Sequence, residues 1–227
     1  MSQLARERED LGVQIVVVAK EPRPGAVKTR LCPPLSPHEA AIVAEAALID
    51  TMQVVARCRV RRRLVALDGA PGPWLPSNCE VMPQRPGPFA GRLEGAIEDA
   101  WARNGLPVLL IGMDTPQLEV ALLESAAQAL LTPGVDASLG PAEDGGYWLL
   151  GTRRPVSGMF AGVPMSTDRT AQVQLARLGA LALRCSLLPM LRDVDTYADA
   201  LAVARSAPHS VFASAIRALG AAVETHA

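Results

Sequence analysis

The sequence is poor in aromatic residues, which make up 4% of its 227 residues although 49% are hydrophobic. Its core must therefore be built mainly from Leu, Val, Ile and Ala, and the length suits one compact domain. The four cysteines are scattered without a Cys-x-x-Cys pair, which argues against a zinc knuckle or a disulfide framework. The three histidines show no metal-ligand spacing. Neither residue type is expected to carry the chemistry.

An excess of one charge is also missing, since 22 basic and 23 acidic residues give a net charge of −1. We therefore expect a small-molecule partner, and neither a nucleic acid nor an anionic membrane. No run approaches the roughly 18 to 20 apolar residues of a membrane span, and residues 1–10 lack the apolar stretch of a signal peptide. The expectation is a cytoplasmic protein, with a flexible segment at residues 1–12 and one domain at residues 13–227. A homodimer is compatible with the sequence.

Short apolar runs alternate with longer helix-like segments, which is typical of a mostly parallel sheet covered by helices. Strands are expected at Val13–Ala19, Leu64–Leu67, Glu80–Pro83, Val108–Ile111, Ala137–Leu139, Tyr147–Leu150 and Leu183–Leu187. Helices are expected from a capping box at Ser36 to about Arg57, and at Phe89–Asn104, Pro116–Leu131, Asp168–Leu178, Tyr197–Arg205 and Val211–Val223. The predicted fold class is α/β, a Rossmann-like three-layer α/β/α sandwich. Ligands in such sheets bind beyond the carboxyl ends of the strands.

A basic loop directly follows the first expected strand. Lys20, Arg23, Lys28 and Arg30 place four cations within eleven residues, and Gly25 permits a close backbone approach to a ligand. Such cations neutralise phosphate, and arginine grips it through two hydrogen bonds. The spacing of a Walker A loop is absent. A merely solvated basic loop is the alternative, but the position after the first strand favours phosphate binding.

Two acidic segments follow other expected strands. In the first, Thr115 is expected to cap the next helix with Pro116 at its first position, which leaves Asp114 as a carboxylate at the strand end. In the second, alternation along an extended backbone points Asp193 and Asp195 the same way. Because Mg²⁺ prefers one or two carboxylates together with phosphate oxygens, Asp114 and Asp195 would suit such an ion. Caps and turns are the alternative interpretation.

A third acidic segment contains paired glycines. Gly145 and Gly146 separate Asp144 from Tyr147, and the backbone of such a tight connection can approach a ligand closely. Asp144 is a candidate for binding an acceptor hydroxyl or for acting as a base, with Gly145, Gly146 and Tyr147 beside the acceptor. An Asp-Gly turn between two strands is the alternative, and both interpretations can hold together.

Taken in order, four blocks resemble the DUF2064 family of GT-A-fold proteins: A-K-x-P-x-P-G-x-V-K-T-R-L, G-x-D-x-P, G-P-A-x-D-G-G-Y and R-D-V-D-T. Members are usually described as glycosyltransferases or nucleotide-diphospho-sugar transferases. The first and last blocks are also similar to the phospholactate guanylyltransferases. The resemblance implies Mg²⁺ (or Mn²⁺) on Asp114 and Asp195, with Asp193 beside them. It also implies that Lys28 and Arg30 contact the phosphates of a nucleotide.

The sequence departs from both relevant classes of transferase. Glycosyltransferases of this fold carry Asp-x-Asp where this chain has Gly112-Met113-Asp114, and the Gly-rich signature of sugar nucleotidyltransferases is reduced to Pro24-Gly25. The first hypothesis is a nucleotidyltransferase that joins a nucleoside monophosphate unit to a small phosphorylated acceptor, with Lys28, Arg30 and Asp144 as catalytic residues. The second is a glycosyltransferase with a nucleotide-sugar donor. The third is a nucleotide-binding protein without turnover.

Overall fold

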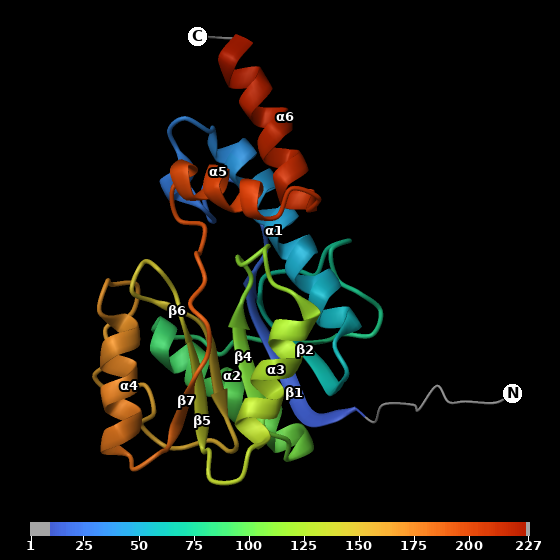
Figure 1. Ribbon diagram of the computed structural model, residues 1–227. Helices are drawn as coiled ribbons and strands as arrows, with labels where there is room; N and C mark the ends of the chain where they lie inside the picture. Colours follow the sequence, from blue (N-terminus) through green and yellow to red (C-terminus); the bar gives the residue numbers. More distant parts are fainter. Residues whose placement is uncertain (1–9, 226–227) are drawn as a thin grey trace, which may run out of the picture.

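The computed structural model describes residues 10–225, and within that range seven strands form one sheet (Figure 1). The strands are β1 (Leu11–Lys20), β2 (Val60–Asp68), β3 (Glu80–Pro83), β4 (Val108–Gly112), β5 (Ala137–Pro141), β6 (Tyr147–Thr152) and β7 (Cys185–Leu187). Their order is β3-β2-β1-β4-β6-β5-β7, and every neighbouring pair is parallel except the two that involve β6. The prediction of a mostly parallel sheet is confirmed.

Helices cover both faces of this sheet. The helices are α1 (Pro37–Arg57), α2 (Phe89–Asn104), α3 (Val120–Leu131), α4 (Thr170–Ala180), α5 (Tyr197–Ser206) and α6 (Val211–Thr225). Side chains of α1 and α3 share one hydrophobic cluster with the sheet, and those of α2 and α4 share another. Figure 1 shows α3 in front of the strands and α4 at their left. The three-layer α/β/α sandwich is confirmed.

The first strand lies in the middle of the core, as its composition predicts. Ile15 and Val17 pack toward α1 and α3, whereas Val16 packs toward α2, and all three side chains are fully buried. Strand side chains alternate between the two faces of a sheet, so only an apolar run can be buried on both. The loop that follows β1 therefore begins at a rigidly packed strand end.

A third hydrophobic cluster lies between the carboxyl end of the sheet and the helices α5 and α6. Leu31 from the basic loop and Val194 from the Asp193–Asp195 segment are both fully buried in it, together with Phe212 of α6. Figure 1 shows α5 above the strands and α6 leading away from them. This cluster anchors two of the segments that the sequence singles out, although they are more than 160 residues apart in the chain.

Two predicted helix boundaries are confirmed in detail. At the start of α1, Ser36 Oγ accepts a hydrogen bond from the Glu39 amide, and the Glu39 carboxylate accepts one from the Ser36 amide. This is the predicted capping box, with Pro37 at the first helical position. Helix α2 ends at Gly105, whose φ of +63° suits glycine.

One predicted helix start is wrong. Helix α3 begins at Val120 and not at Pro116, and its N-cap residue is Glu119 instead of Thr115. The amide of Leu118 donates to the Thr115 carbonyl, so residues 115–118 form a turn, and the Leu118 side chain is buried against the α1–α3 cluster. Burial of the Leu118 side chain favours this turn over an earlier start of the helix. The remaining strand and helix ends differ from prediction by a few residues, most at β2, which begins at Val60.

The N-terminal boundary also shifts. Leu11 and Gly12 already belong to β1, and residues 1–9 of the expected flexible segment lie outside the described residues. Among the described helices, none has the length and hydropathy needed to cross a membrane.

Candidate functional site

A cleft of about 470 Å³ opens at the carboxyl edge of the parallel strands. It collects side chains from the loops that follow β1, β4 and β7 and from the β5–β6 turn. Candidate residues from the sequence that line it are Lys20, Lys28, Arg30, Asp114, Asp144, Gly146, Tyr147, Asp193 and Asp195. Segments from four parts of the chain therefore meet at one site, as the strand-end argument predicts.

Three candidate residues do not line this cleft. The Arg23 side chain is 61% exposed and its Nε lies 3.8 Å from a carboxylate oxygen of Glu21, so it belongs to the outer surface of the loop. Gly25 has a φ of +75° with open space around it, which makes it a turn residue. Gly145 likewise acts through the backbone, since its carbonyl accepts a hydrogen bond from the Ala171 amide at 2.8 Å. Phosphate contact by Arg23 or Gly25 stays a prediction.

Lys28 is held in the middle of the site. Its Nζ atom lies 2.7 Å from Asp114 Oδ2 and also donates to the carbonyl of Val194. The side chain is only 11% exposed, and its backbone has a φ of +47°, which is uncommon for a residue with a side chain. The short 3₁₀ helix η1 (Thr29–Leu31) follows, and buried Leu31 fixes it. The basic loop is thus bonded to both acidic strand-end segments.

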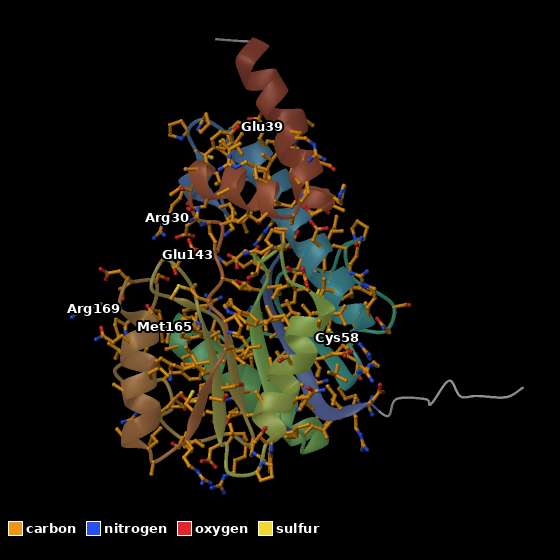
Figure 2. All side chains as sticks on the ribbon, viewed as in Figure 1. Arg30, Glu39, Cys58, Glu143, Met165 and Arg169 are labelled. Atoms are coloured by element: carbon orange, nitrogen blue, oxygen red, sulfur yellow. The ribbon has the colours of Figure 1, made fainter. Side chains whose placement is uncertain are left out.

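The two lysines of the sequence, Lys20 and Lys28, both line the cleft. Every other side-chain cation apart from histidine is an arginine. Arg30 is the third candidate cation here, and its Nη1 pairs with Asp195 Oδ2 while the side chain stays 64% exposed. Figure 2 shows Arg30 on the loop below α5 and Glu143 on the β5–β6 turn, both at the end of the sheet that faces α5.

Backbone pairing brings the β5–β6 turn to the segment after β7. Ala142 forms a parallel bridge with Leu191, and the amide of Glu143 donates to the Leu191 carbonyl at 2.9 Å. The carboxylate of Glu143 then pairs with Arg192, whose Nη2 lies 2.6 Å from it. These contacts place Asp144 next to Asp193, a proximity that no single sequence block reveals.

Asp144, Asp193 and Asp195 form an acidic trio. One carboxylate oxygen from each lies within 4.8 Å of the others. Burial, together with the charges of Asp144, Asp195 and Asp114, raises the pKa of Asp193 to about 6, and Lys28 opposes this only in part. Oxygen donors at this spacing, which repel one another, fit a divalent cation such as Mg²⁺ or Mn²⁺. Asp114 lies outside the trio and is paired with Lys28, and the predicted metal pairing of Asp114 with Asp195 stays a prediction.

The turn that carries Asp144 is tightly constrained. The Gly146 amide donates to Asp144 Oδ1 at 2.7 Å, and Gly145 has a φ of +90°. A Cβ atom on Gly145 would lie 2.0 Å from the carbonyl oxygen of Asp168, just before α4. The segment is therefore a hairpin turn that also places a carboxylate in the cleft, and the role of Asp144 toward an acceptor stays a prediction.

Sequence reasoning missed one side of the cleft. Gln84, Phe89 and Arg92, at and after the end of β3, line it together with residues just before α4, among them Met165 and Ser166. Figure 2 shows Met165 beside α4. The sequence predicts β3 with its observed bounds. Because ligands bind beyond the carboxyl ends of the strands, the segment between β3 and α2 was also a candidate. In α2, Gly91-Arg92-Leu93-Glu94 is not a clear base-recognition block, so the sequence alone does not assign this side of the cleft to the site.

Residues 43–167 match the family described as uncharacterized protein conserved in bacteria (DUF2064). The match covers more than half of the chain, which therefore belongs to the DUF2064 family, and the predicted resemblance is confirmed. The basic loop and the Asp193–Asp195 segment lie outside the matched residues. No curated protein matches the sequence.

Solved structures with the same fold are found among nucleotide-using enzymes. A protein of Desulfovibrio desulfuricans G20, provisionally named a nucleotide-diphospho-sugar transferase, is 25% identical with a TM-score of 0.84, over 94% of this chain and 97% of that one. A cytidylyltransferase from Leptospira borgpetersenii serovar Hardjo-bovis is 10% identical with a TM-score of 0.54, over 92% and 94% of the two chains. The CMP:2-keto-3-deoxy-manno-octonic acid synthetase, solved with CTP, is 12% identical with a TM-score of 0.52, over 85% and 99%. The last two likenesses concern the fold alone, and the GT-A-like fold class is confirmed.

Proposed function

We propose that this chain is a metal-dependent nucleotidyltransferase that joins a nucleoside monophosphate unit to a small phosphorylated acceptor. The coarser class, a nucleotide-using transferase, rests on the GT-A-like fold and on similarity to the Desulfovibrio protein. The observation that carries the finer proposal is the placement of Lys28. It is a nearly buried cation, bonded to Asp114 and to the carbonyl of Val194, in the same cleft as the acidic trio.

The cations of the cleft suit a triphosphate. Lys28 and Lys20 are point charges, and Arg30 offers a planar fork that can hold two phosphoryl oxygens. Lys28 is preorganised by its two bonds, so little side-chain entropy is lost when a phosphate binds. Arg30 is exposed and pairs with only one carboxylate, which leaves it free to exchange that partner for phosphate.

The acidic trio would hold the divalent cation, Mg²⁺ or Mn²⁺. When bound, this ion supplies charge neutralisation on the phosphoryl oxygens. The raised pKa of Asp193 reflects the repulsion that a cation would relieve. Asp144, at the exposed edge of the trio, also orients the acceptor, with Gly146 and Tyr147 beside it.

In the proposed reaction an oxygen of the acceptor phosphate attacks the α-phosphorus of a nucleoside triphosphate. The bond between the α-phosphorus and the bridging oxygen breaks, and pyrophosphate leaves. Lys28 and Arg30 stabilise the charge that grows on the phosphoryl oxygens, and catalysis consists mainly of positioning and electrostatics. Product analysis with each NTP, Mg²⁺ and a set of phosphorylated acceptors tests this reaction. Pyrophosphate and a nucleoside diphosphate-linked product are expected. Release of a nucleoside diphosphate from a sugar nucleotide, without pyrophosphate from any NTP, would refute it.

Glycosyl transfer from a nucleotide sugar is the second candidate, and the name of the Desulfovibrio protein favours it. In that reaction Asp144 would orient or deprotonate the acceptor, and the cations would stabilise the departing diphosphate. It predicts that UDP- or GDP-sugars with Mn²⁺ or Mg²⁺ raise the melting temperature more than NTPs do. Stabilisation by NTPs alone favours the first candidate.

Two substitutions test the assignment of the metal ligands. Asp195→Ala removes a member of the trio, so we expect nucleotide binding to lose its dependence on Mg²⁺. Asp114→Ala removes the partner of Lys28 instead, so affinity should fall while the Mg²⁺ dependence remains. If the two variants behave alike, or if neither changes the Mg²⁺ dependence, the assignment to Asp144, Asp193 and Asp195 is wrong.

A further inference from the structure

One side of the cleft has an apolar surface that the chemistry above does not use. Val18 of β1, Leu110 of β4 and Leu93 of α2 line it, and all belong to, or pack against, the cluster between the sheet and α2. Phe89 and Arg92, on the first turn of α2, complete this side. Phe89 is 41% exposed although its side chain is large and apolar. An exposed aromatic ring beside an apolar surface is suited to stack on another flat ring.

Arg92 is held in place by its neighbours. Its Nη1 donates to Gln84 Oε1 at 3.0 Å and to Asp68 Oδ2 at 3.2 Å, and its Cζ lies 5.3 Å from the centroid of the Phe89 ring. Gln84 is fixed in turn, because its Nε2 donates to the carbonyls of Ala19 and Ala66 at 2.9 Å each. The guanidinium and the ring are therefore preorganised from the backbones of β1 and β2.

The guanidinium has donors to spare. Arg92 Nε is buried and has no hydrogen-bond partner among the described residues. A guanidinium carries five N–H donors, which is more than its two bonds to Gln84 and Asp68 use. A buried donor without a partner is costly, and ligand-binding sites are one place where such a cost is retained. A ligand in the cleft could accept from the remaining N–H groups of Arg92, and exposed Phe89 beside the apolar surface suits a ligand with a flat ring.

We propose that Phe89 and Arg92 form the subsite for the nucleobase, in which Phe89 stacks on the ring and Arg92 donates to its acceptor atoms. This inference rests on the proposed use of a nucleotide. Val18 is only two residues before Lys20 on β1, so the subsite adjoins the cations assigned to the phosphates. Guanine, cytosine and uracil carry a carbonyl oxygen as acceptor, whereas adenine offers only ring nitrogens as acceptors and an exocyclic donor. The subsite therefore favours the three carbonyl-bearing bases over adenine.

Calorimetric titration with GTP, CTP, UTP, ATP and inorganic tripolyphosphate, each with Mg²⁺, tests this subsite. For the wild type, we expect at least one carbonyl-bearing NTP to bind about 5-fold or more tighter than tripolyphosphate, with ATP weaker than that NTP. Phe89→Ala and Arg92→Ala should each weaken this NTP by about 5-fold or more and leave tripolyphosphate unchanged. Phe89→Leu keeps most of the side-chain volume, and Arg92→Lys keeps the charge. Both should show the same selective loss of NTP affinity, which would show that the loss does not come from misfolding.

Helix α2 itself provides matched controls. Trp101 and Arg103 are an exposed aromatic residue and an exposed arginine near the other end of α2 and do not line the cleft, so Trp101→Ala and Arg103→Ala should not change any affinity. Variants at Phe89 and Arg92 that bind NTPs like the wild type, or that weaken tripolyphosphate equally, would overturn the subsite while leaving the phosphate site intact. If the wild type binds neither tripolyphosphate nor any NTP, the proposed function itself fails, and the subsite with it.

Discussion

The amine of Lys28 lies 2.7 Å from the carboxylate of Asp114, and it also donates to the carbonyl of Val194. This arrangement joins the loop after β1 to the end of β4 and to the segment between Asp193 and Asp195. In the proposed function, Asp114 would position Lys28, and the carboxylates of Asp144, Asp193 and Asp195 would hold the metal.

Amine labelling at the two lysines offers a simple test of where nucleotides bind. Lys20 is exposed, whereas Lys28 is 11% exposed and paired, so an acylating reagent should label Lys20 much faster than Lys28. A saturating NTP with Mg²⁺ should slow labelling of both, because both line the cleft. Peptide mass spectrometry measures each rate, with a sample that contains Mg²⁺ but no nucleotide as the control. Labelling rates that stay the same when the nucleotide is added would show that its phosphates bind elsewhere.

Asp193→Asn should stabilise the protein at neutral pH when no divalent metal is added. Burial first, and then the neighbouring carboxylates, raise the pKa of Asp193 from its ordinary value of 3.8 to about 6. A carboxyl group whose pKa is higher in the folded state contributes stability at low pH, and this contribution is lost as the pH rises from about 4 to about 6. At pH 7 the substitution should therefore raise stability by about 1 kcal/mol after allowance for solvent screening, or about 2–4 °C in Tm.

The pH dependence of this effect provides its own check. At pH 4 the variant and the wild type should melt within about 1 °C of each other, because the gain at pH 7 reflects the charge of Asp193. Added Mg²⁺ should stabilise the wild type more than the variant at pH 7. Glu45→Gln, on α1 and not among the residues that line the cleft, is the control. A variant that is less stable than the wild type at pH 7 would contradict the repulsion within the trio.

Gly145→Ala should disturb the turn that carries Asp144. The new Cβ would lie 2.0 Å from the Asp168 carbonyl, in addition to the strain of a φ of +90°. We expect a loss of about 1–3 kcal/mol in stability and a weaker affinity for Mg²⁺. Gly162→Ala is the matched control, since Gly162 has a φ of +74° but open space around it. Equal losses in the two variants would show strain alone and no specific packing of the turn against α4.

Asp50→Ala should loosen the attachment of α6. Asp50 lies on α1 with 8% exposure, and its carboxylate accepts hydrogen bonds from the amides of Val211 at 3.0 Å and Phe212 at 2.8 Å. Without it these amides lose their acceptor, at a cost of about 2–3 kcal/mol. Ser210→Ala removes a cap to Ala213 and should cost about 1 kcal/mol. Chemical denaturation measures the free energy of unfolding of both variants. An Asp50→Ala variant as stable as the wild type would show that α6 is held by its apolar contacts alone.

The sheet and its helices could be predicted because their residues repeat at the period of their structure. Glu80–Pro83 and Phe89–Asn104 have the predicted bounds, and Ser36 has its capping box. The start of α3 could not be predicted, because a local cap signal at Thr115 competes with the burial of Leu118, which only the folded core determines.

The sequence predicts which strand ends form the candidate site, but not which side chains pair with one another there. Asp114, Asp144, Asp193 and Asp195 all reach the cleft, as the strand-end rule predicts. Which of them pair depends on long-range contacts such as Arg192 with Glu143 and Lys28 with Val194. Those contacts have no local pattern in the sequence, so the sequence alone predicts neither the pairing of Lys28 with Asp114 nor the proximity of Asp144 to Asp193.

The coupling between nucleotide and metal tests the central claim most directly. Calorimetry should measure the affinity of the wild type, Lys28→Ala and Asp195→Ala for the NTP that binds best, with Mg²⁺ and with EDTA. We expect Mg²⁺ to tighten wild-type binding by about 10-fold or more, Asp195→Ala to abolish that gain, and Lys28→Ala to weaken binding in both conditions. Binding that is the same with Mg²⁺ and EDTA, and that both substitutions leave unchanged, would contradict a metal–nucleotide site in this cleft.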